Sequence, residues 1–363
     1  MKISAALSTD AEAPFELAEV ELDEPRRDEV LVQMRAVGVC HSDLTMKAVW
    51  PQEISPIVLG HEGAGVVMAV GDDVAGVRAG DHVLLSYRSC GSCAECATGY
   101  PPYCRNFRSL NGIGTRVDGS LTMTRNGAAV YGSYFGQSSF ASHALAYESN
   151  VVVVDDEIDL TLAAPLACGV QTGAGTVLNV LAPEPDTSLV VFGAGAVGLS
   201  ALMVAAAIGV RTIIAVDPVA GRRHLATELG ATETLDPAAG DVSAAVHELT
   251  DGGAAFAIDT SAKGAVINQA ITALAPRGTL ALLGIGIPDF AMDVRSVISG
   301  GKTIRGVIEG EAVPQTFIPR LIALHREGRL PLQKLIRTYE FGDIATAFAD
   351  ATSGSAIKPV LTF

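Results

Sequence analysis

Residues 189–198 read LVVFGAGAVG, and an alanine-rich segment follows them directly. The apolar run 189–192 predicts a buried strand, and the run from Leu199 to Val210 predicts a buried helix. In a glycine loop between strand and helix, the first glycine permits a tight turn, the second admits a pyrophosphate and the third allows close helix packing. The pattern predicts a dinucleotide site at the start of the helix. The loop residues proposed to bind it are Gly193, Gly195, Ala196, Val197 and Gly198.

The next apolar run, Thr212 to Val216, ends at Asp217. A carboxylate about twenty residues past such glycines accepts hydrogen bonds from the adenosine ribose and repels a 2′-phosphate. At about 4 Å and an effective dielectric of about 20, this repulsion costs about 4 kcal/mol, on the order of a thousandfold in affinity. The sequence therefore predicts NAD rather than NADP. Arg222 or Arg223 could offset the repulsion by turning toward the ribose.

The repeating pattern of strands and helices indicates two domains. From about Gly169, strand-like runs alternate with helical stretches, as in βαβ units with a parallel sheet. Before it, short β-branched runs such as Val30 to Val32 alternate with turn residues, as in an antiparallel, partly closed β domain. A chain of 363 residues also exceeds the usual size of one core. We expect an α/β protein with one domain made of residues 1–168 and 311–363 and another made of residues 169–310.

Composition argues against several classes of partner. A net charge of −15 would repel nucleic acids and anionic membranes. The longest apolar run is too short to cross a bilayer, and the first residues lack an apolar core of signal-peptide length. We expect a cytoplasmic protein that binds neither nucleic acid nor membranes.

Four of the six cysteines follow the pattern C-x2-C-x2-C-x7-C. Zn²⁺ binds four thiolates tetrahedrally, and a site closed in this way is structural. Zinc binding worth about 10 to 16 kcal/mol in small zinc peptides would order a lobe rich in Gly, Ser and Pro. Disulfides are the alternative, which a reducing cytoplasm disfavours. The four predicted ligands are Cys90, Cys93, Cys96 and Cys104.

The remaining cysteines, Cys40 and Cys168, combine with His61 into a second candidate site. Alone, a buried cysteine is usually a small hydrophobic residue. Together the three offer two thiolates and one imidazole, the ligand set of a catalytic zinc with an open fourth position. Asp43 could accept the other ring N–H of His61 and fix its tautomer, and Glu62 could reach the metal from the rear.

The whole chain resembles the zinc-containing medium-chain alcohol dehydrogenases, with motifs in the family's order. The Gly-His-Glu motif within 60–65 and the cysteine loop 90–104 match the family. The stretches 133–141, SYFGQSSFA, and 301–310, GKTIRGVIEG, resemble its benzyl (aryl) alcohol dehydrogenase branch, which includes geraniol-type enzymes. The resemblance implies a GroES-like domain beside a Rossmann domain, and one catalytic and one structural zinc per chain. It also implies a homodimer or homotetramer, which we expect to form through an edge strand near Thr279 to Ile287.

The resemblance also implies roles for single residues. Ser42 corresponds to the hydroxyl that accepts the substrate proton, and Thr45 stands where many members carry a histidine of the proton relay. His41 is a candidate substitute for that histidine, or a contact to the cofactor phosphate. The cofactor positions implied are Thr172 and Ile285 near the nicotinamide, Lys358 near the pyrophosphate and Arg222 near the ribose.

These features predict reversible oxidation of a primary aromatic or allylic alcohol, with hydride transfer to NAD⁺. Zinc would lower the pKa of the alcohol, much as it lowers that of bound water from 15.7 to about 7. Trp50, Tyr87 and Phe135 are candidates for an apolar wall, although ordinary packing explains them equally well. The alternatives are a zinc-independent NADPH quinone or enone reductase, a glutathione-linked aldehyde dehydrogenase, and a non-catalytic NAD-binding relative. The three metal ligands argue against the first and the last.

Overall fold

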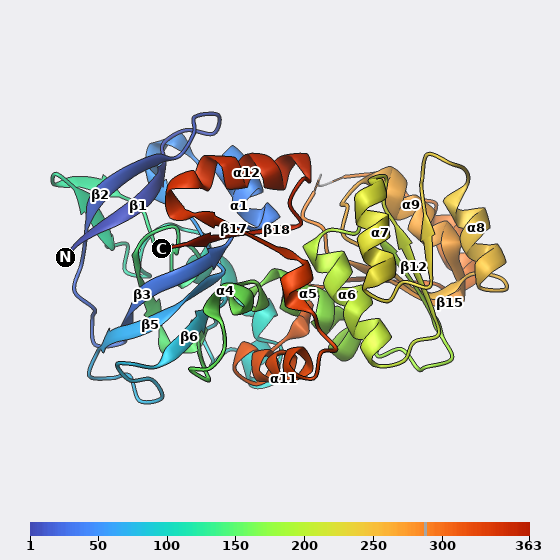
Figure 1. Ribbon diagram of the computed structural model, residues 1–363, viewed down its shortest axis with the longest axis horizontal. Coiled ribbons are helices and arrows are strands. Elements are labelled where there is room, and N and C mark those ends of the chain that lie inside the picture. The colour runs from blue at the N-terminus through green and yellow to red at the C-terminus, as the bar shows by residue number, and fades with distance from the viewer. Residues whose placement is uncertain (287–288) are drawn as a thin grey trace. The chain divides into compact units, whose positions relative to one another are not determined.

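The computed structural model describes residues 1–286 and 289–363 (Figure 1). The described residues form two compact units, each with its own hydrophobic core. The chain leaves the first unit directly after Cys168 and first returns to it at Val313. Unit 1 consists of Met1–Cys168, Val313–Ile322 and Leu332–Phe363, and unit 2 consists of Gly169–Ala312 and Ala323–Pro331.

Unit 1 is built mainly of antiparallel strands in two sheets, which confirms the expected β domain. One sheet has the order β4-β1-β2-β7-β8; the other has the order β10-β6-β5-β3-β18-β17, with β9 also on β3. The C-terminal strand β18 pairs antiparallel with β3 and parallel with β17. The strands are β1 (Lys2–Ser8), β2 (Glu16–Leu22), β3 (Glu29–Gly38), β4 (Ile57–Val58), β5 (Gly63–Val70), β6 (His82–Leu85), β7 (Met123–Arg125), β8 (Ala128–Val130), β9 (His143–Tyr147), β10 (Val151–Val154), β17 (Ile336–Glu340) and β18 (Lys358–Thr362).

Short helices connect these strands. The first begins at His41, three residues after β3 ends, and the last packs on β17 and β18. The helices of unit 1 are α1 (His41–Val49), α2 (Ala94–Ala97), α3 (Phe107–Asn111), α4 (Leu160–Ala163) and α12 (Ile344–Ser353), while α11 (Pro314–Arg326) has residues in both units. β3 ends at Gly38, α1 begins at His41 and β5 begins at Gly63. The ends of these elements bring Cys40 and His61 together in one region of unit 1.

Unit 2 contains a six-stranded parallel sheet with the order β13-β12-β11-β14-β15-β16. Consecutive residues of β11, such as Val190 and Val191, point to opposite faces of the sheet and are fully buried, so both faces are covered. The structure confirms the predicted strands and the doubly wound α/β class. The elements are α5 (Gly169–Gly175), β11 (Ser188–Phe192), α6 (Ala196–Ala207), β12 (Thr212–Val216), α7 (Ala220–Glu228), β13 (Glu233–Leu235), α8 (Val242–Leu249), β14 (Ala254–Asp259), α9 (Gly264–Ala273), β15 (Leu274–Leu282), α10 (Val294–Gly300) and β16 (Thr303–Gly306).

The apolar segment after the glycine loop forms the buried helix that the sequence predicts. Residues 198–205 of α6 are all buried. No helix within residues 1–286 and 289–363 is long and apolar enough to cross a membrane.

The expectation of an edge strand near Thr279 to Ile287 is wrong. β15 pairs with β14 on one side and with β16 on the other, so the edges of the sheet are β13 and β16. Ile287 lies outside the described residues. The short strand β16 has the sequence TIRG and is mostly exposed, so it lacks the apolar run that would reveal a strand in the sequence.

Candidate metal centres and cofactor loop

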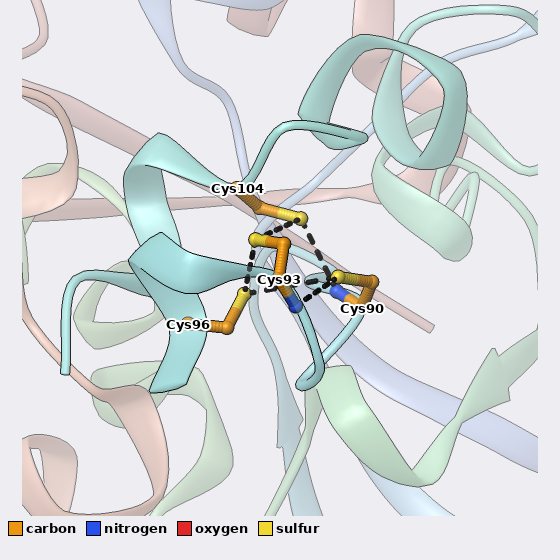
Figure 2. A group of neighbouring side chains, drawn as sticks. All are labelled: Cys90, Cys93, Cys96 and Cys104. Carbon is orange, nitrogen blue, oxygen red and sulfur yellow. Dashed lines mark hydrogen bonds between the residues drawn. The ribbon is translucent and has the colours of Figure 1, made fainter. Parts of the chain in front are cut away.

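The four predicted structural ligands lie together in one lobe of unit 1 (Figure 2). The Cys93 sulfur lies 3.5 Å from that of Cys96 and 4.0 Å from that of Cys104, and the Cys90 sulfur lies 4.0 Å from that of Cys96. None of these cysteines is in a disulfide. A tetrahedron with Zn–S bonds of about 2.3 Å has edges of about 3.8 Å, so the spacing fits a zinc ion.

Short helical turns and backbone N–H groups shape this lobe. Cys93 precedes α2, Cys96 lies within it, and Cys104 follows a turn of 3₁₀ helix over Pro101–Tyr103. Backbone N–H groups of Ser92 and Cys93 lower the pKa of the Cys90 thiol to about 5. Thiolate is the form that binds metal, so these N–H groups favour it at Cys90, whereas burial raises the pKa of the Cys96 thiol to about 12 and also raises that of Cys104.

The second cluster lies deep in unit 1. Ligand atoms of Cys40, His61, Glu62 and Cys168 are all within 4.8 Å of one another, and all four residues are buried. Cys40 is the N-cap of α1, and Cys168 immediately precedes α5. A hydrogen bond from Cys168 lowers the pKa of the Cys40 thiol, and the charge of Lys358 acts in the same direction against burial.

The histidine of this set is held with one nitrogen directed to a carboxylate. His61 Nδ1 lies 2.8 Å from Asp43 Oδ1. Asp43 also accepts the backbone N–H groups of Cys40 at 3.0 Å and Gly60 at 3.2 Å, so its orientation is fixed. Nδ1 therefore carries the proton, and Nε2 is buried with no hydrogen-bond partner. An orphaned imidazole nitrogen beside two thiols is what a zinc ligand set requires.

A buried ion pair lies next to the same set. Lys358 Nζ is 2.9 Å from both carboxylate oxygens of Glu62 and 3.2 Å from the Val39 carbonyl oxygen. Burial raises the pKa of Glu62 to about 7, although Lys358 opposes that shift. The structure thus places the Lys358 ammonium group against Glu62, and its contact with the cofactor pyrophosphate stays a prediction.

The three hydroxyl and imidazole candidates lie along α1. Ser42 Oγ is 3.8 Å from Cys40 Sγ, so the hydroxyl borders the metal-ligand set. His41 is the first residue of the helix and is exposed, whereas Thr45 is partly buried. Of the three, Ser42 is therefore the one shown in contact with a candidate metal ligand.

Aromatic rings cover one side of His61. The Phe135 ring is 4.6 Å from the imidazole between centroids, at 31°, and packs edge-on against Tyr134 and Phe107 at 4.9 and 6.1 Å. Tyr87 lies one ring further out, 5.9 Å from Phe107. Trp50 instead donates its ring N–H to the Ile54 carbonyl at 2.8 Å. Sequence reasoning missed Phe107 and Tyr134, because nothing in their spacing from His61 indicates contact.

The glycine loop has the geometry that the motif predicts. Gly193 has a φ of +100°, and its N–H donates to the Val216 carbonyl at 2.8 Å. A Cβ at Gly198 would collide with the Gly193 carbonyl oxygen, so α6 requires glycine there. At Gly195 a Cβ would meet no atom within 4 Å. The open backbone at Gly195, at the N-cap of α6, fits the phosphate-binding position of a dinucleotide site.

The acidic residue after β12 faces this loop. Asp217 accepts the N–H groups of Ala194 and Val219, each at 2.8 Å. Arg222 Nη1 is 3.8 Å from Asp217 Oδ2, and its buried Nε has no hydrogen-bond partner. Arg223 instead pairs with Asp236 at 2.8 Å.

Two further cofactor candidates lie elsewhere in unit 2. Thr172, in α5, has its hydroxyl 3.4 Å from Glu309 Oε2. Ile285 follows β15 and is 67% exposed. Their proximity to a nicotinamide stays a prediction.

Comparison with known proteins agrees with these sites. Residues 26–156 match the alcohol dehydrogenase GroES-like domain family, and residues 196–326 match the zinc-binding dehydrogenase family. The chain is 44% identical to a geraniol dehydrogenase from Castellaniella defragrans, over 99% of this chain and 97% of that protein. It is 36% identical to an NDMA-dependent alcohol dehydrogenase from Amycolatopsis methanolica, over 99% of each.

Solved structures agree as well. The benzyl alcohol dehydrogenase of Acinetobacter calcoaceticus superposes with a TM-score of 0.96 at 40% identity, covering 100% of this chain and 99% of that one. An alcohol dehydrogenase zinc-binding domain protein from Burkholderia ambifaria gives 0.97 at 46% identity, with the same coverage. The chain therefore belongs to the zinc-containing medium-chain alcohol dehydrogenase family, in the branch of the benzyl alcohol and geraniol dehydrogenases.

Proposed function

We propose that the protein is an NAD-dependent alcohol dehydrogenase that reversibly oxidises a primary aromatic or allylic alcohol to its aldehyde. The main support is the buried His61 Nε2, which has no hydrogen-bond partner and lies in one set with the thiols of Cys40 and Cys168. These three residues would hold the catalytic zinc. When bound, zinc supplies a Lewis acid that favours loss of the substrate hydroxyl proton.

The chain's own residues then act on the proton and the ring tautomer. Asp43 keeps the proton of His61 on Nδ1 and so leaves Nε2 basic. The Ser42 hydroxyl, beside Cys40, accepts the proton of the substrate hydroxyl and passes it outward. His41, the exposed residue directly before Ser42, is the proposed exit to solvent in place of the family histidine that Thr45 replaces.

An aromatic wall supports the proposed substrate class. Phe135 presents its ring beside His61, and Phe107 and Tyr134 hold that ring edge-on. A flat aryl group or a planar isoprenoid gains favourable ring contacts on such a surface. The names of the relatives, benzyl alcohol and geraniol dehydrogenase, are in line with this class.

The glycine loop and Asp217 support NAD as the hydride acceptor. A bound NAD⁺ would supply the hydride acceptor, and the backbone at Gly195 would hold its pyrophosphate. The Asp217 carboxylate faces the loop through Ala194 and disfavours a 2′-phosphate. Arg222 lies 3.8 Å from that carboxylate and partly balances its charge, so we expect the preference for NAD to be smaller than an unpaired carboxylate would give.

A substrate panel tests this proposal. NADH absorbance is followed with zinc-loaded protein and benzyl alcohol, geraniol, ethanol or hydroxymethylglutathione, with NAD⁺ and then NADP⁺. We expect turnover of the first two alcohols and a preference for NAD⁺ of up to about a thousandfold. Turnover of hydroxymethylglutathione alone would indicate the glutathione-linked enzyme. Reduction of quinones with NADPH and no alcohol oxidation would favour the reductase.

Self-association through unit 2 is part of the same proposal. β16 is an edge strand, and α10, which precedes it in the chain, exposes Ile298 at 75%. An unpaired edge with exposed apolar neighbours favours pairing with a second copy. Light scattering should give the mass of a dimer or tetramer, whereas a monomer mass would contradict it. A cytoplasmic location also stays a prediction.

A further inference from the structure

A strained turn lies between β8 and β9, beside the buried metal-ligand set. Ser133, Phe135 and Ser138 all have positive φ, at 60°, 53° and 54°. Non-glycine residues rarely adopt this conformation because it is strained, so surrounding contacts must impose it. The turn presents Phe135 to His61. Its side-chain contacts therefore bear on the metal site.

The contacts of Gln137 dominate this turn. Its amide nitrogen donates toward the carbonyl oxygens of His61, Leu85 and Ser86, each at 3.0 Å. Its amide oxygen accepts the N–H of Gly63 at 3.1 Å. Gln137 is only 1% exposed. Three acceptors near the amide nitrogen and two donors at the amide oxygen, the Gly63 N–H and the Ser139 hydroxyl, fix the orientation of the amide.

Two of these bonds bracket the segment that carries a metal ligand. The His61 carbonyl and the Gly63 N–H stand on either side of Glu62, so one amide holds the whole tripeptide. His61 Nε2 can point at a metal only if this backbone stays in place.

Another hydrogen bond of Gln137 connects it, through Ser86, to the segment that carries Cys168. Gln137 binds the Ser86 carbonyl, and the Ser86 hydroxyl donates to the Ala167 carbonyl at 2.6 Å. Ala167 immediately precedes Cys168. Through Ser86, the amide thus connects the segments of two ligands that are far apart in the chain.

We propose that Gln137 is a positioning residue of the catalytic zinc site, where its amide sets the spacing between the His61 and Cys168 backbones. The proposal rests on the proposed role of these residues as zinc ligands. Gln137 touches neither zinc nor substrate, and acts only through the backbone carbonyls and the N–H that it binds. A role confined to stability would leave the metal affinity of the site unchanged.

Gln137→Met tests this, because methionine fills a similar volume and removes every amide hydrogen bond. Asn111→Leu is the matched control. Asn111 is another buried amide in unit 1, bonded to Arg88 and Phe107 beside the four-cysteine lobe but not to the backbone of residues 61–63, 86 or 167. Both variants leave buried carbonyls unpaired, so both should lose stability.

The readouts are competition of the protein with a zinc chelator, the visible spectrum after cobalt substitution, and kcat with KM. We expect Gln137→Met to bind the catalytic metal about 10- to 100-fold more weakly, with an altered cobalt spectrum and a lower kcat. In Asn111→Leu the affinity of the catalytic site and its spectrum should match the wild type. Equal metal affinity and spectrum in Gln137→Met, with stability alone reduced, would overturn the proposal.

A second variant covers the case in which Gln137→Met does not fold. Ser86→Ala keeps the glutamine and removes the hydroxyl that donates to Ala167. We expect several-fold weaker catalytic-metal binding, and unchanged binding would overturn the proposed connection. Failure of the proposed function is separate, since it would show in the wild type as a missing second metal ion and no turnover.

Discussion

The four-cysteine lobe and the buried Cys40–His61–Cys168 set are two candidate metal sites that the chain builds by different means. The lobe draws its four ligands from residues 90–104, and three of the four are partly exposed. The buried set draws its ligands from positions 40, 61 and 168, and needs β3, β5 and α1 in place. Local spacing builds the first site, whereas tertiary structure builds the second. Loss of metal should therefore unfold the lobe but leave the fold around the buried set.

Cys96→Ser should have the largest effect on stability. Structural zinc contributes about 10 to 16 kcal/mol in small zinc peptides, and loss of one thiolate removes a large part of that. The lobe should become sensitive to limited proteolysis, and thermal unfolding should begin earlier. Cys96→Ser protein with wild-type protease resistance would contradict a structural role.

His61→Ala should instead affect catalysis. Loss of the catalytic metal removes several kcal/mol of transition-state stabilisation, about a thousandfold or more in kcat. The circular dichroism spectrum and the zinc of the lobe should persist. Loss of both zinc ions on this one substitution would show that the two sites are not independent.

Glu29→Gln tests a source of acid sensitivity in unit 1 that does not involve metal binding. Burial opposes ionisation of Glu29, but hydrogen bonds from Arg116 at 2.6 and 3.1 Å outweigh it and lower its pKa. A lowered folded pKa gives stability that is full above the unfolded value near about 4.3 and is lost as the pH falls through the folded value. We expect about 3 to 5 kcal/mol lost at neutral pH and a smaller further loss on acidification. Urea unfolding at pH 7 and pH 4 measures the free energy of unfolding of both proteins. If the variant lost as much stability between the two pH values as the wild type does, the proposed role of Glu29 would be refuted.

Asp43→Asn should weaken the buried site while leaving the lobe unchanged. An amide can still contact the imidazole, but it does not fix the proton on Nδ1 as strongly as a carboxylate. Affinity for the catalytic zinc should fall about 10- to 100-fold. A chelator titration with metal analysis distinguishes the two ions, and equal weakening of both would contradict the account.

Phe135→Leu should have the smallest effect. Ring contacts of this kind are worth about 0.5 to 1.5 kcal/mol, so kcat/KM for benzyl alcohol should fall about 2- to 10-fold. Ethanol should be affected little, because it has no ring to contact. An equal loss for both alcohols would indicate that Phe135 stabilises the position of His61 and does not contact the substrate.

The same contrast explains which features the sequence could predict. The glycine loop and the four cysteines are short, local patterns, and the structure has them in the expected geometry. Gln137 could not be predicted, because its partners lie in two other segments and its residue type is ordinary in a turn. The assignment of β15 as an edge strand failed because β16 is only four residues long and mostly exposed.

The most direct test measures zinc content and NADH formation from benzyl alcohol on the same samples of wild type and Cys40→Ala. The account predicts two zinc ions and turnover in the wild type, and one zinc ion with no detectable turnover in a folded Cys40→Ala protein. A Cys40→Ala protein that keeps two zinc ions, or that oxidises the alcohol at the wild-type rate, would contradict the claim that the buried set carries the chemistry.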